Sequence, residues 1–296
     1  MPSDSTPQRT PDALRGILLM CLGVSMFPFL NTCAKLLSTE YPLLEIVWAR
    51  FTGHFLVMAL IFLPSSGWRL FAAHRLSIQI VRSVLLLGST LFFIRAIGTV
   101  PLATASTIGF TTPLMVTALS VPMLHEAVGP RRWAAVGVGF IGALIVIRPG
   151  SGFTDPAMLL LVGSAVCYAL YQIFTRRGAF HDNAETGIVY AALIGTLVMS
   201  VLAPLDFELP RRWTDYLLFA ALGVFGGFGH YFVTQAFRLG PAAVISPLGY
   251  VELLGTTIMG YLVFGNFPDL WTWVGAALIV ASGIYIAFRE RRRRKV

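Results

Sequence analysis

Polar and aromatic side chains that could bind a ligand recur inside long apolar stretches of this chain. Asn31, Tyr168, His230 and Glu252 each lie within a run of roughly 20 mostly hydrophobic residues. Polar groups that face lipid cost roughly several kcal/mol, so such side chains turn inward, where they bond to neighbouring helices or to a ligand. The candidate binding residues are Phe27, Asn31, Thr90, Phe92, Tyr168, Tyr171, His230, Tyr231, Thr234, Ser246, Tyr250 and Glu252.

These residue types favour binding over covalent chemistry. Neutral hydroxyl, amide and imidazole groups beside aromatic rings suit both ends of a zwitterion, whereas a polyanion would require several Lys or Arg at mid-depth. We expect mid-depth positions to be nearly free of these, with Lys35 and Arg95 toward the outer side. Arg50 and Arg82 are expected near span ends, at the interface or in structural ion pairs. An organic cation would need a buried carboxylate, and Glu252 is the only central candidate.

Sequence motifs of catalysis and cofactor binding are weak or missing. Gly137, Gly139 and Gly142 satisfy GxGxxG, but they lie in an apolar span and not in a βαβ unit. Small residues in such a span let helices approach closely, so we expect these glycines to pack. Neither a GxxxxGK[ST] phosphate loop nor an HExxH metal motif occurs in the sequence. The sequence therefore predicts no enzyme activity, no cofactor and no metal site.

The composition is that of a membrane protein. The 296 residues are 56% hydrophobic and 12% charged, with a mean hydropathy of +0.75, whereas soluble domains are about 25% charged. Pro28, Pro113 and Pro247 fall inside apolar runs and are expected to kink them. The predicted fold is an all-α polytopic membrane protein with ten transmembrane helices, at residues 16–37, 43–63, 77–98, 102–123, 133–148, 157–175, 184–204, 214–238, 242–264 and 271–288.

The chain repeats itself with an offset of 140 residues. Prolines, glycines, glutamates and tryptophans stay in step, which chance matching of apolar residues does not explain. Each half holds five spans, an odd number, so the second half begins on the opposite side of the membrane and the two repeats are inverted. Such duplication is common among membrane transporters. The matched pairs include Gly23 and Gly163, Glu45 and Glu185, Pro101 and Pro241, Ser106 and Ser246, and Trp133 and Trp273.

The positions of basic residues predict the orientation of the chain. Six of the last eight residues are Arg or Lys, and Arg131, Arg132, Arg176 and Arg177 fall on the same side as both termini. Since cytoplasmic loops carry an excess of positive charge, both termini are expected in the cytoplasm. A basic run directly after an apolar span is an anchor of this kind and not a nucleic-acid-binding tail. We expect tails at 1–15 and 289–296 around five-helix repeats at 16–148 and 156–288.

Short matching motifs in both halves carry a resemblance to a known family. An Ala-x4-Pro-x-Ala-x2-Ser stretch occurs at 96–106 and again at 236–246. Together with ten spans in two inverted halves, it resembles the drug/metabolite transporter superfamily, specifically its EamA-type branch. Glu126 before Trp133 is similar to the acidic turn of that family, whereas Asn266 departs from it in the second half. The resemblance implies a central cavity lined by the first, third, fourth, sixth, eighth and ninth spans.

The overall pattern is most similar to bacterial exporters of aromatic and other amino acids. It implies export of small metabolites, above all amino acids, across the bacterial inner membrane by alternating access around the cavity. The expected partners are a small-molecule substrate and the lipid bilayer, without nucleic acid, and a monomer is compatible with this architecture. The alternative is a multidrug exporter of organic cations. An intramembrane enzyme or a lipid flippase belongs to another class, which the missing catalytic motifs disfavour.

The topology predicts where reporter domains are active. A reporter that works only in the cytoplasm should give signal when fused after Val296, and also when inserted near Arg131. The same reporter near Arg148 should be silent, because that loop follows a fifth, outward-directed span. Fluorescence or enzyme activity of the reporter in intact cells is the measurement. Strong signal near Arg148 would contradict the inverted arrangement.

Overall fold

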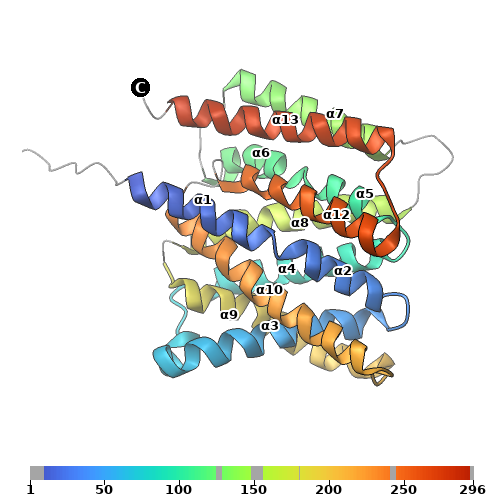
Figure 1. Cartoon of the computed structure of the whole chain (residues 1–296). Coiled ribbons are helices and arrows are strands. Elements are labelled where there is room, and N and C mark those ends of the chain that lie inside the picture. The colour runs from blue at the N-terminus through green and yellow to red at the C-terminus, as the bar shows by residue number, and fades with distance from the viewer. Residues whose placement is uncertain (1–9, 125–128, 148–155, 180, 241–244, 294–296) are drawn as a thin grey trace, which may run out of the picture.

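Helices make up the regular secondary structure of the described chain, in accordance with the predicted all-α class (Figure 1). The computed structural model describes residues 10–124, 129–147, 156–179, 181–240 and 245–293. The α-helices are α1 Thr10–Val24, α2 Phe27–Leu37, α3 Leu43–Ser66, α4 Leu76–Ile97, α5 Leu102–Gly109, α6 Thr112–Leu124, α7 Pro130–Ile147, α8 Pro156–Gly178, α9 Ala184–Leu202, α10 Trp213–Leu239, α12 Val251–Phe264 and α13 Leu270–Arg293. Three short 3-10 helices complete them, at η1 Gly67–Phe71, η2 Ala203–Asp206 and η3 Ser246–Tyr250.

The helices are long and apolar enough to cross a membrane, as the sequence predicts. Eight candidate spans lie within the described ranges, from Leu14–Leu37 to Trp213–Leu239. Two shorter apolar helices, Leu248–Phe264 and Leu270–Ile286, fall where the ninth and tenth spans are expected. One boundary differs: α13 continues to Arg293, so the basic segment from 289 onward begins as helix instead of as a separate tail.

Three predicted spans are interrupted beside a proline. The first span divides into α1 and α2 at Ser25–Met26, and Pro28 stands in the first turn of α2. The fourth divides into α5 and α6 at residues 110–111, just before Pro113, and η3 with Pro247 precedes α12 in the ninth. Proline has no N–H to donate and its ring obstructs the preceding turn, so it is tolerated only where a helix begins. The expectation of kinks at these three prolines is confirmed.

Glycines set the closest helix contacts. Gly223 of α10 lies against Gly53 of α3, so that a Cβ added at Gly223 would come within 2.5 Å of the Gly53 Cα atom. Gly142 of α7 faces Gly275 of α13 in the same way, at 2.8 Å from its carbonyl oxygen. Without a hydrophobic force between helices in lipid, close van der Waals packing of small residues holds them together. Gly142 of the GxGxxG stretch is therefore a packing residue, as expected.

The helices are arranged in a bundle whose axes run roughly along one direction (Figure 1). α7 and α13 pack side by side at one edge, and α3 with α9 and α10 forms the opposite edge. α8 lies between them against α4 and α6, while α1 packs on α10 and α2 on both α10 and α12. The interrupted spans therefore lie in the interior of the bundle, between two edges of continuous helices.

The glycine contact between α3 and α10 predicts a stability effect. Gly223→Ala should lower the unfolding free energy by about 1–3 kcal/mol, because the added methyl group overpacks a backbone contact. Gly137→Ala is the matched control, since no atom lies within 4 Å of a Cβ at that position. It should change stability by less than about 1 kcal/mol. Thermal unfolding of both variants in detergent is the measurement, and equal melting temperatures would contradict the prediction.

Candidate ligand-binding cavity

A cavity lies in the interior of the bundle where the interrupted spans meet. Its empty volume is about 900 Å³, including the part that opens to solvent. Ligand pockets of proteins usually fall between about 300 and 1,000 Å³. The lining residues come from eight helices, from η3 and from the break at 110: Met20, Val24, Phe27, Asn31, Arg50, Leu86, Ser89, Thr90, Phe93, Ser106, Gly109, Phe110, Thr112, Pro113, Leu161, Ser164, Ala165, Tyr168, Gln172, His230, Gly249 and Glu252.

The proline breaks position part of this lining. Phe27 begins α2, Phe110 and Thr112 flank the break in the fourth span, and Gly249 belongs to η3. Backbone that leaves helical geometry at membrane depth must be buried in protein or line a polar cavity, because lipid cannot satisfy its N–H and C=O groups. Discontinuous helices of this kind form the substrate sites of many transporters. The local sequence thus places its helix breaks where a polar ligand could be held.

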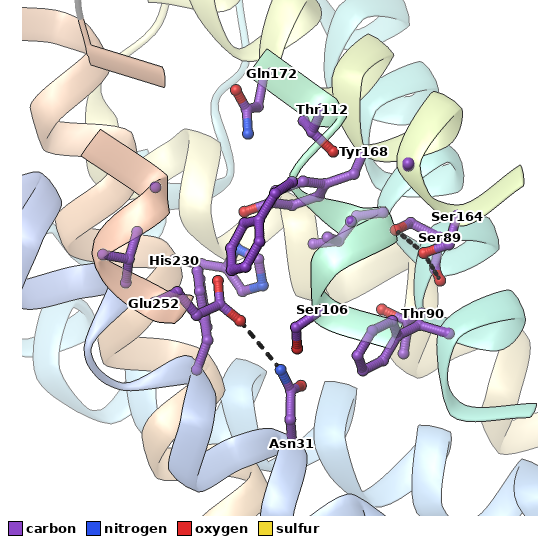
Figure 2. A pocket seen from close by; sticks show the side chains of 18 of the residues that line it. Asn31, Ser89, Thr90, Ser106, Thr112, Ser164, Tyr168, Gln172, His230 and Glu252 are labelled. Carbon is purple, nitrogen blue, oxygen red and sulfur yellow. Dashed lines mark hydrogen bonds between the residues drawn. The ribbon is translucent and has the colours of Figure 1, made fainter. Parts of the chain in front are cut away.

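Two opposite charges face the cavity. Glu252 at the start of α12 accepts a hydrogen bond from the Asn31 side chain, with 3.3 Å between Nδ2 and Oε1 (Figure 2). Arg50 of α3 is 9% exposed and attracts the Glu252 carboxylate electrostatically. The structure describes both residues, and no ion pair closes between them. Each buried charge therefore keeps capacity for a charged group of a ligand.

Aromatic rings surround His230 on α10. Its ring centroid lies 5.0 Å from that of Phe27 and 6.3 Å from that of Tyr168, both of which line the cavity. Behind this layer, Tyr171 stacks on Tyr168 with 5.5 Å between centroids, and His54 of α3 stacks on His230 at 5.8 Å. Such faces accept flat or cationic groups through stacking and cation–π contacts.

Several lining side chains have unused hydrogen-bonding capacity. Ser106 Oγ, Gln172 Oε1 and both ring nitrogens of His230 are buried and lack a partner among the described residues. By contrast, Ser89 and Ser164 bond to each other across α4 and α8, at 3.0 Å between hydroxyl oxygens. A buried polar group without a partner costs about 1–3 kcal/mol, so a bound ligand that supplies partners recovers this energy. Figure 2 shows Ser106 and His230 on either side of the Asn31–Glu252 pair.

The structure brings half of the expected binding residues together. These are Phe27, Asn31, Thr90, Tyr168, His230 and Glu252, which all line the cavity.

Five others lie elsewhere, because their position on the helix turns them away. Phe92 is 39% exposed and packs on Gly163, and Tyr171 is buried behind Tyr168. Tyr231 points toward Phe62 and accepts a hydrogen bond from Gln235. Thr234 is buried away from the cavity, and Tyr250 packs against Phe110 and Gly283. The side chain of Ser246 lies outside the described residues, as does Glu126.

Two arginines correct the sequence-based expectation. Arg50 was expected at the interface but lines the cavity, and Arg82 of α4 is 2% exposed in the protein interior. Arg82 contacts Tyr171 and Gln79 instead of a carboxylate, so it is not in a structural ion pair. Mid-depth is thus not free of basic residues. The available signal was an Arg only one turn from the span end that a long side chain reaches inward from, which periodicity alone does not distinguish from snorkelling outward.

Comparison with known proteins identifies the family. The profile of the EamA-like transporter family matches residues 14–148 and again residues 155–288, and the chain belongs to this family. It is 26% identical over 279 residues to the S-adenosylmethionine uptake transporter of Rickettsia prowazekii, covering 94% of each chain. It is also 29% identical to the riboflavin transporter of Rhizobium johnstonii, covering 96% of this chain and 94% of that one. A crystal structure with 18% identity covers 98% of this chain and 100% of its own, with a TM-score of 0.71, and shows the same fold.

The cavity geometry predicts opposite outcomes for two neighbouring residues of α10. His230→Ala should lower the apparent affinity for the transported metabolite roughly 5- to 150-fold, since it removes buried hydrogen-bonding groups. Tyr231→Phe is the matched control, because this ring packs on Phe62 outside the cavity. Initial rates in proteoliposomes, at equal amounts of folded protein, are the measurement. Equal loss in both variants, or in neither, would show that the cavity is not the binding site.

Proposed function

We propose that this membrane transporter carries a small zwitterionic metabolite with an amino-acid group in the central cavity. The observation that carries the proposal is the pair of unbridged, opposite charges Arg50 and Glu252 in one buried cavity. A substrate carboxylate would bond to Arg50, and a substrate ammonium would bond to Glu252 beside Asn31. Hydrogen bonds to charged partners are each worth about 1.5–3 kcal/mol, which offsets the desolvation of the substrate ends. A substrate with only one of these charges leaves the other protein charge unmatched.

The remaining lining suits a substrate with a flat portion. Phe27, Tyr168 and His230 offer ring faces, and Gln172 and Ser106 offer free polar atoms next to them. S-adenosylmethionine combines an amino-acid end, a sulfonium cation and an adenine ring, so each part of it finds a matching group. The relative named as an S-adenosylmethionine uptake transporter supports this choice. Free amino acids, the substrates expected from the sequence, fill only the charged portion of the cavity.

Riboflavin is the second candidate. It has no ammonium and no carboxylate, but its flavin ring would stack on the same aromatic faces and its hydroxyl chain would bond to Ser and Thr side chains of the lining. The relative named as a riboflavin transporter supports it. Arg50 and Glu252 rank it second, because two buried charges would meet only neutral groups of this molecule.

We propose transport by alternating access between two inverted five-helix repeats at 16–148 and 156–288. The double match of the family profile supports the duplication. A pair of cationic contacts supports the inverted symmetry. Lys35 at the end of α2 donates to the carbonyls of Ile97 and Val100 at 2.8 and 2.7 Å. Arg176 near the end of α8 donates to Phe237 and Gly240, which stand 140 positions after those two residues.

Under this proposal the protein lies in the bacterial inner membrane with both termini in the cytoplasm. Alternating access without an energy source carries a substrate down its gradient in either direction. Export, the direction expected from the sequence, is therefore measured separately from uptake, with substrate loaded on one side of the vesicle or the other.

Two charge-removing variants test the substrate class. Arg50→Met and Glu252→Gln should each lower the apparent affinity for S-adenosylmethionine roughly 10- to 150-fold, by loss of one charged hydrogen bond. Riboflavin transport, if present, should change far less. Uptake of labelled S-adenosylmethionine, methionine, phenylalanine, riboflavin and a quaternary organic cation into proteoliposomes is the measurement.

The pattern across this panel separates the alternatives. A multidrug exporter of cations would lose activity with Glu252→Gln and keep it with Arg50→Met. Glu208→Gln is the control for removal of an acid, because its exposed side chain pairs only with Arg211 in the same loop. Transport of riboflavin alone by the unmodified protein, or of the cation alone, would show that the zwitterion proposal is wrong.

A further inference from the structure

A buried polar cluster around Asp215 ties the two halves of the chain together. The Tyr41 hydroxyl, in the loop between α2 and α3, donates to Asp215 Oδ2 at 2.6 Å and accepts from the backbone N of Arg211 at 2.9 Å. Asp215 is 2% exposed, and the Tyr41 ring packs edge-on against Phe219 with 5.2 Å between centroids. Arg212 bonds to Asp215 and also to Glu40. These contacts form what we call the Asp215 lock.

A second cluster around Asp182 ties the halves together elsewhere. Asp182 precedes α9 and accepts from the Gln79 side chain at 2.8 Å and from the backbone N of His74 at 2.6 Å. Its backbone carbonyl accepts from Arg238 at 2.9 Å. Burial raises the pKa of Asp182, but the hydrogen bonds from Gln79 and His74 outweigh it and lower the pKa below its usual value. Asp182 is therefore a carboxylate at neutral pH, and these contacts form the Asp182 lock.

The two locks occupy equivalent places in the duplicated sequence. The position 140 residues after Tyr41 is next to Asp182, and the position 140 residues after Gln79 is Phe219. Each lock joins the loop before the second span of one half to the start of the third span of the other half. They lie at opposite ends of α3, a helix of 24 residues, because one involves the loop before it and the other the loop after it. A helix of that length separates them by about 36 Å.

The Asp182 lock is in contact with the wall of the cavity. Gln79 bonds through its Oε1 to Arg82 at 3.3 Å, and Arg82 bonds to the Tyr171 hydroxyl at 3.4 Å. The Arg82 guanidinium also lies 5.3 Å from the centre of the Tyr171 ring, which stacks on the cavity residue Tyr168. Every member of this series is buried or packed on the next, so separation at the lock moves side chains that reach the cavity wall.

We propose that the Asp215 lock and the Asp182 lock are the two gates of this transporter, one at each membrane face. This proposal rests on transport by alternating access, as proposed above. Access from one face requires the halves to part at that face while they stay joined at the other. The bonds that must break are those that cross between the halves at one end, and the two locks are such bonds. By the predicted orientation, the Asp182 lock faces the cytoplasm and the Asp215 lock faces outward.

Opposite changes in accessibility of the cavity test this proposal. Cys21, Cys33 and Cys167 are free thiols, so they are first replaced by Ala in the full chain. Ala165→Cys then places one thiol on the cavity lining. A membrane-impermeant maleimide is applied to right-side-out and inside-out vesicles, and the labelling rates from the two faces are compared. Asp182→Asn and Gln79→Leu weaken one lock, and Asp215→Asn and Tyr41→Phe weaken the other.

The expected result is a shift of roughly tenfold in the ratio of inner to outer labelling, the amount that loss of one charged hydrogen bond allows. The Asp182 and Gln79 variants should raise labelling from the cytoplasmic face, and the Asp215 and Tyr41 variants should raise it from the outer face. Glu208→Gln should leave the ratio unchanged, because it removes an ion pair within a single loop. Tyr41→Phe and Gln79→Leu change single side chains and provide a folded variant for each lock if the aspartate variants are not produced.

Shifts toward the same face, or unchanged ratios in all folded lock variants, would overturn the gate assignment. The labelling readout needs no substrate, which separates this proposal from the one above. Opposite shifts in a protein that carries no zwitterion leave the gates standing and refute the substrate class. Zwitterion transport with unchanged labelling ratios refutes the gates and leaves the substrate class standing.

Discussion

The requirement that every backbone polar group be satisfied inside a lipid bilayer governs this structure. Continuous helices meet the requirement by themselves, whereas an interrupted helix meets it only when surrounded by protein or a polar space. Here the breaks at Ser25–Met26, at residues 110–111 and at η3 all lie in spans that line the cavity. The continuous pairs, such as α7 with α13, lie at the edge of the bundle. The division between a regular exterior and an irregular interior follows from this one constraint.

Buried charge in the cavity is the second consequence of removing the site from water. Glu252 is held by Asn31 and attracted by Arg50, yet neither charge is neutralised by a direct ion pair. Removing one partner from a buried charge is costly, so a protein that keeps such a separated pair has a use for it. A ligand with two complementary charges would complete the pair. This reasoning moves the chemistry of the cavity away from neutral hydrogen bonding alone, which the sequence favoured.

The contacts at the bundle ends show how duplication and function can be related. Lys35 and Arg176 each cap the end of a helix within their own half, whereas Tyr41 with Asp215 and Gln79 with Asp182 cross between the halves. Bonds within a half keep that half rigid, and bonds between halves resist their separation. The same 140-residue offset relates the members of both classes. Two rigid units joined by breakable end contacts are what a rocking motion around a central site requires.

The sequence by itself determined the class of protein, the number and approximate positions of the spans, and the prolines that interrupt them. These features depend on local composition: length of apolar runs, absence of an N–H in proline, and small residues such as Gly142 that mark close packing. The family followed from the same residues. The type of residue expected in the cavity was also right for Asn31, Tyr168, His230 and Glu252, because polar groups in a span must turn inward.

Only the tertiary structure decided which of the inward residues share one space. Tyr168 and Tyr171 are three positions apart on α8, yet one faces the cavity and the other lies behind it against Arg82. His230 and Tyr231 are adjacent, but the helix turns the second ring toward Phe62. Arg50 has the sequence signature of an interfacial residue and reaches inward. The direction of a side chain around a helix axis is set by how that helix packs on its neighbours, and a single sequence does not contain those crossing angles and rotations.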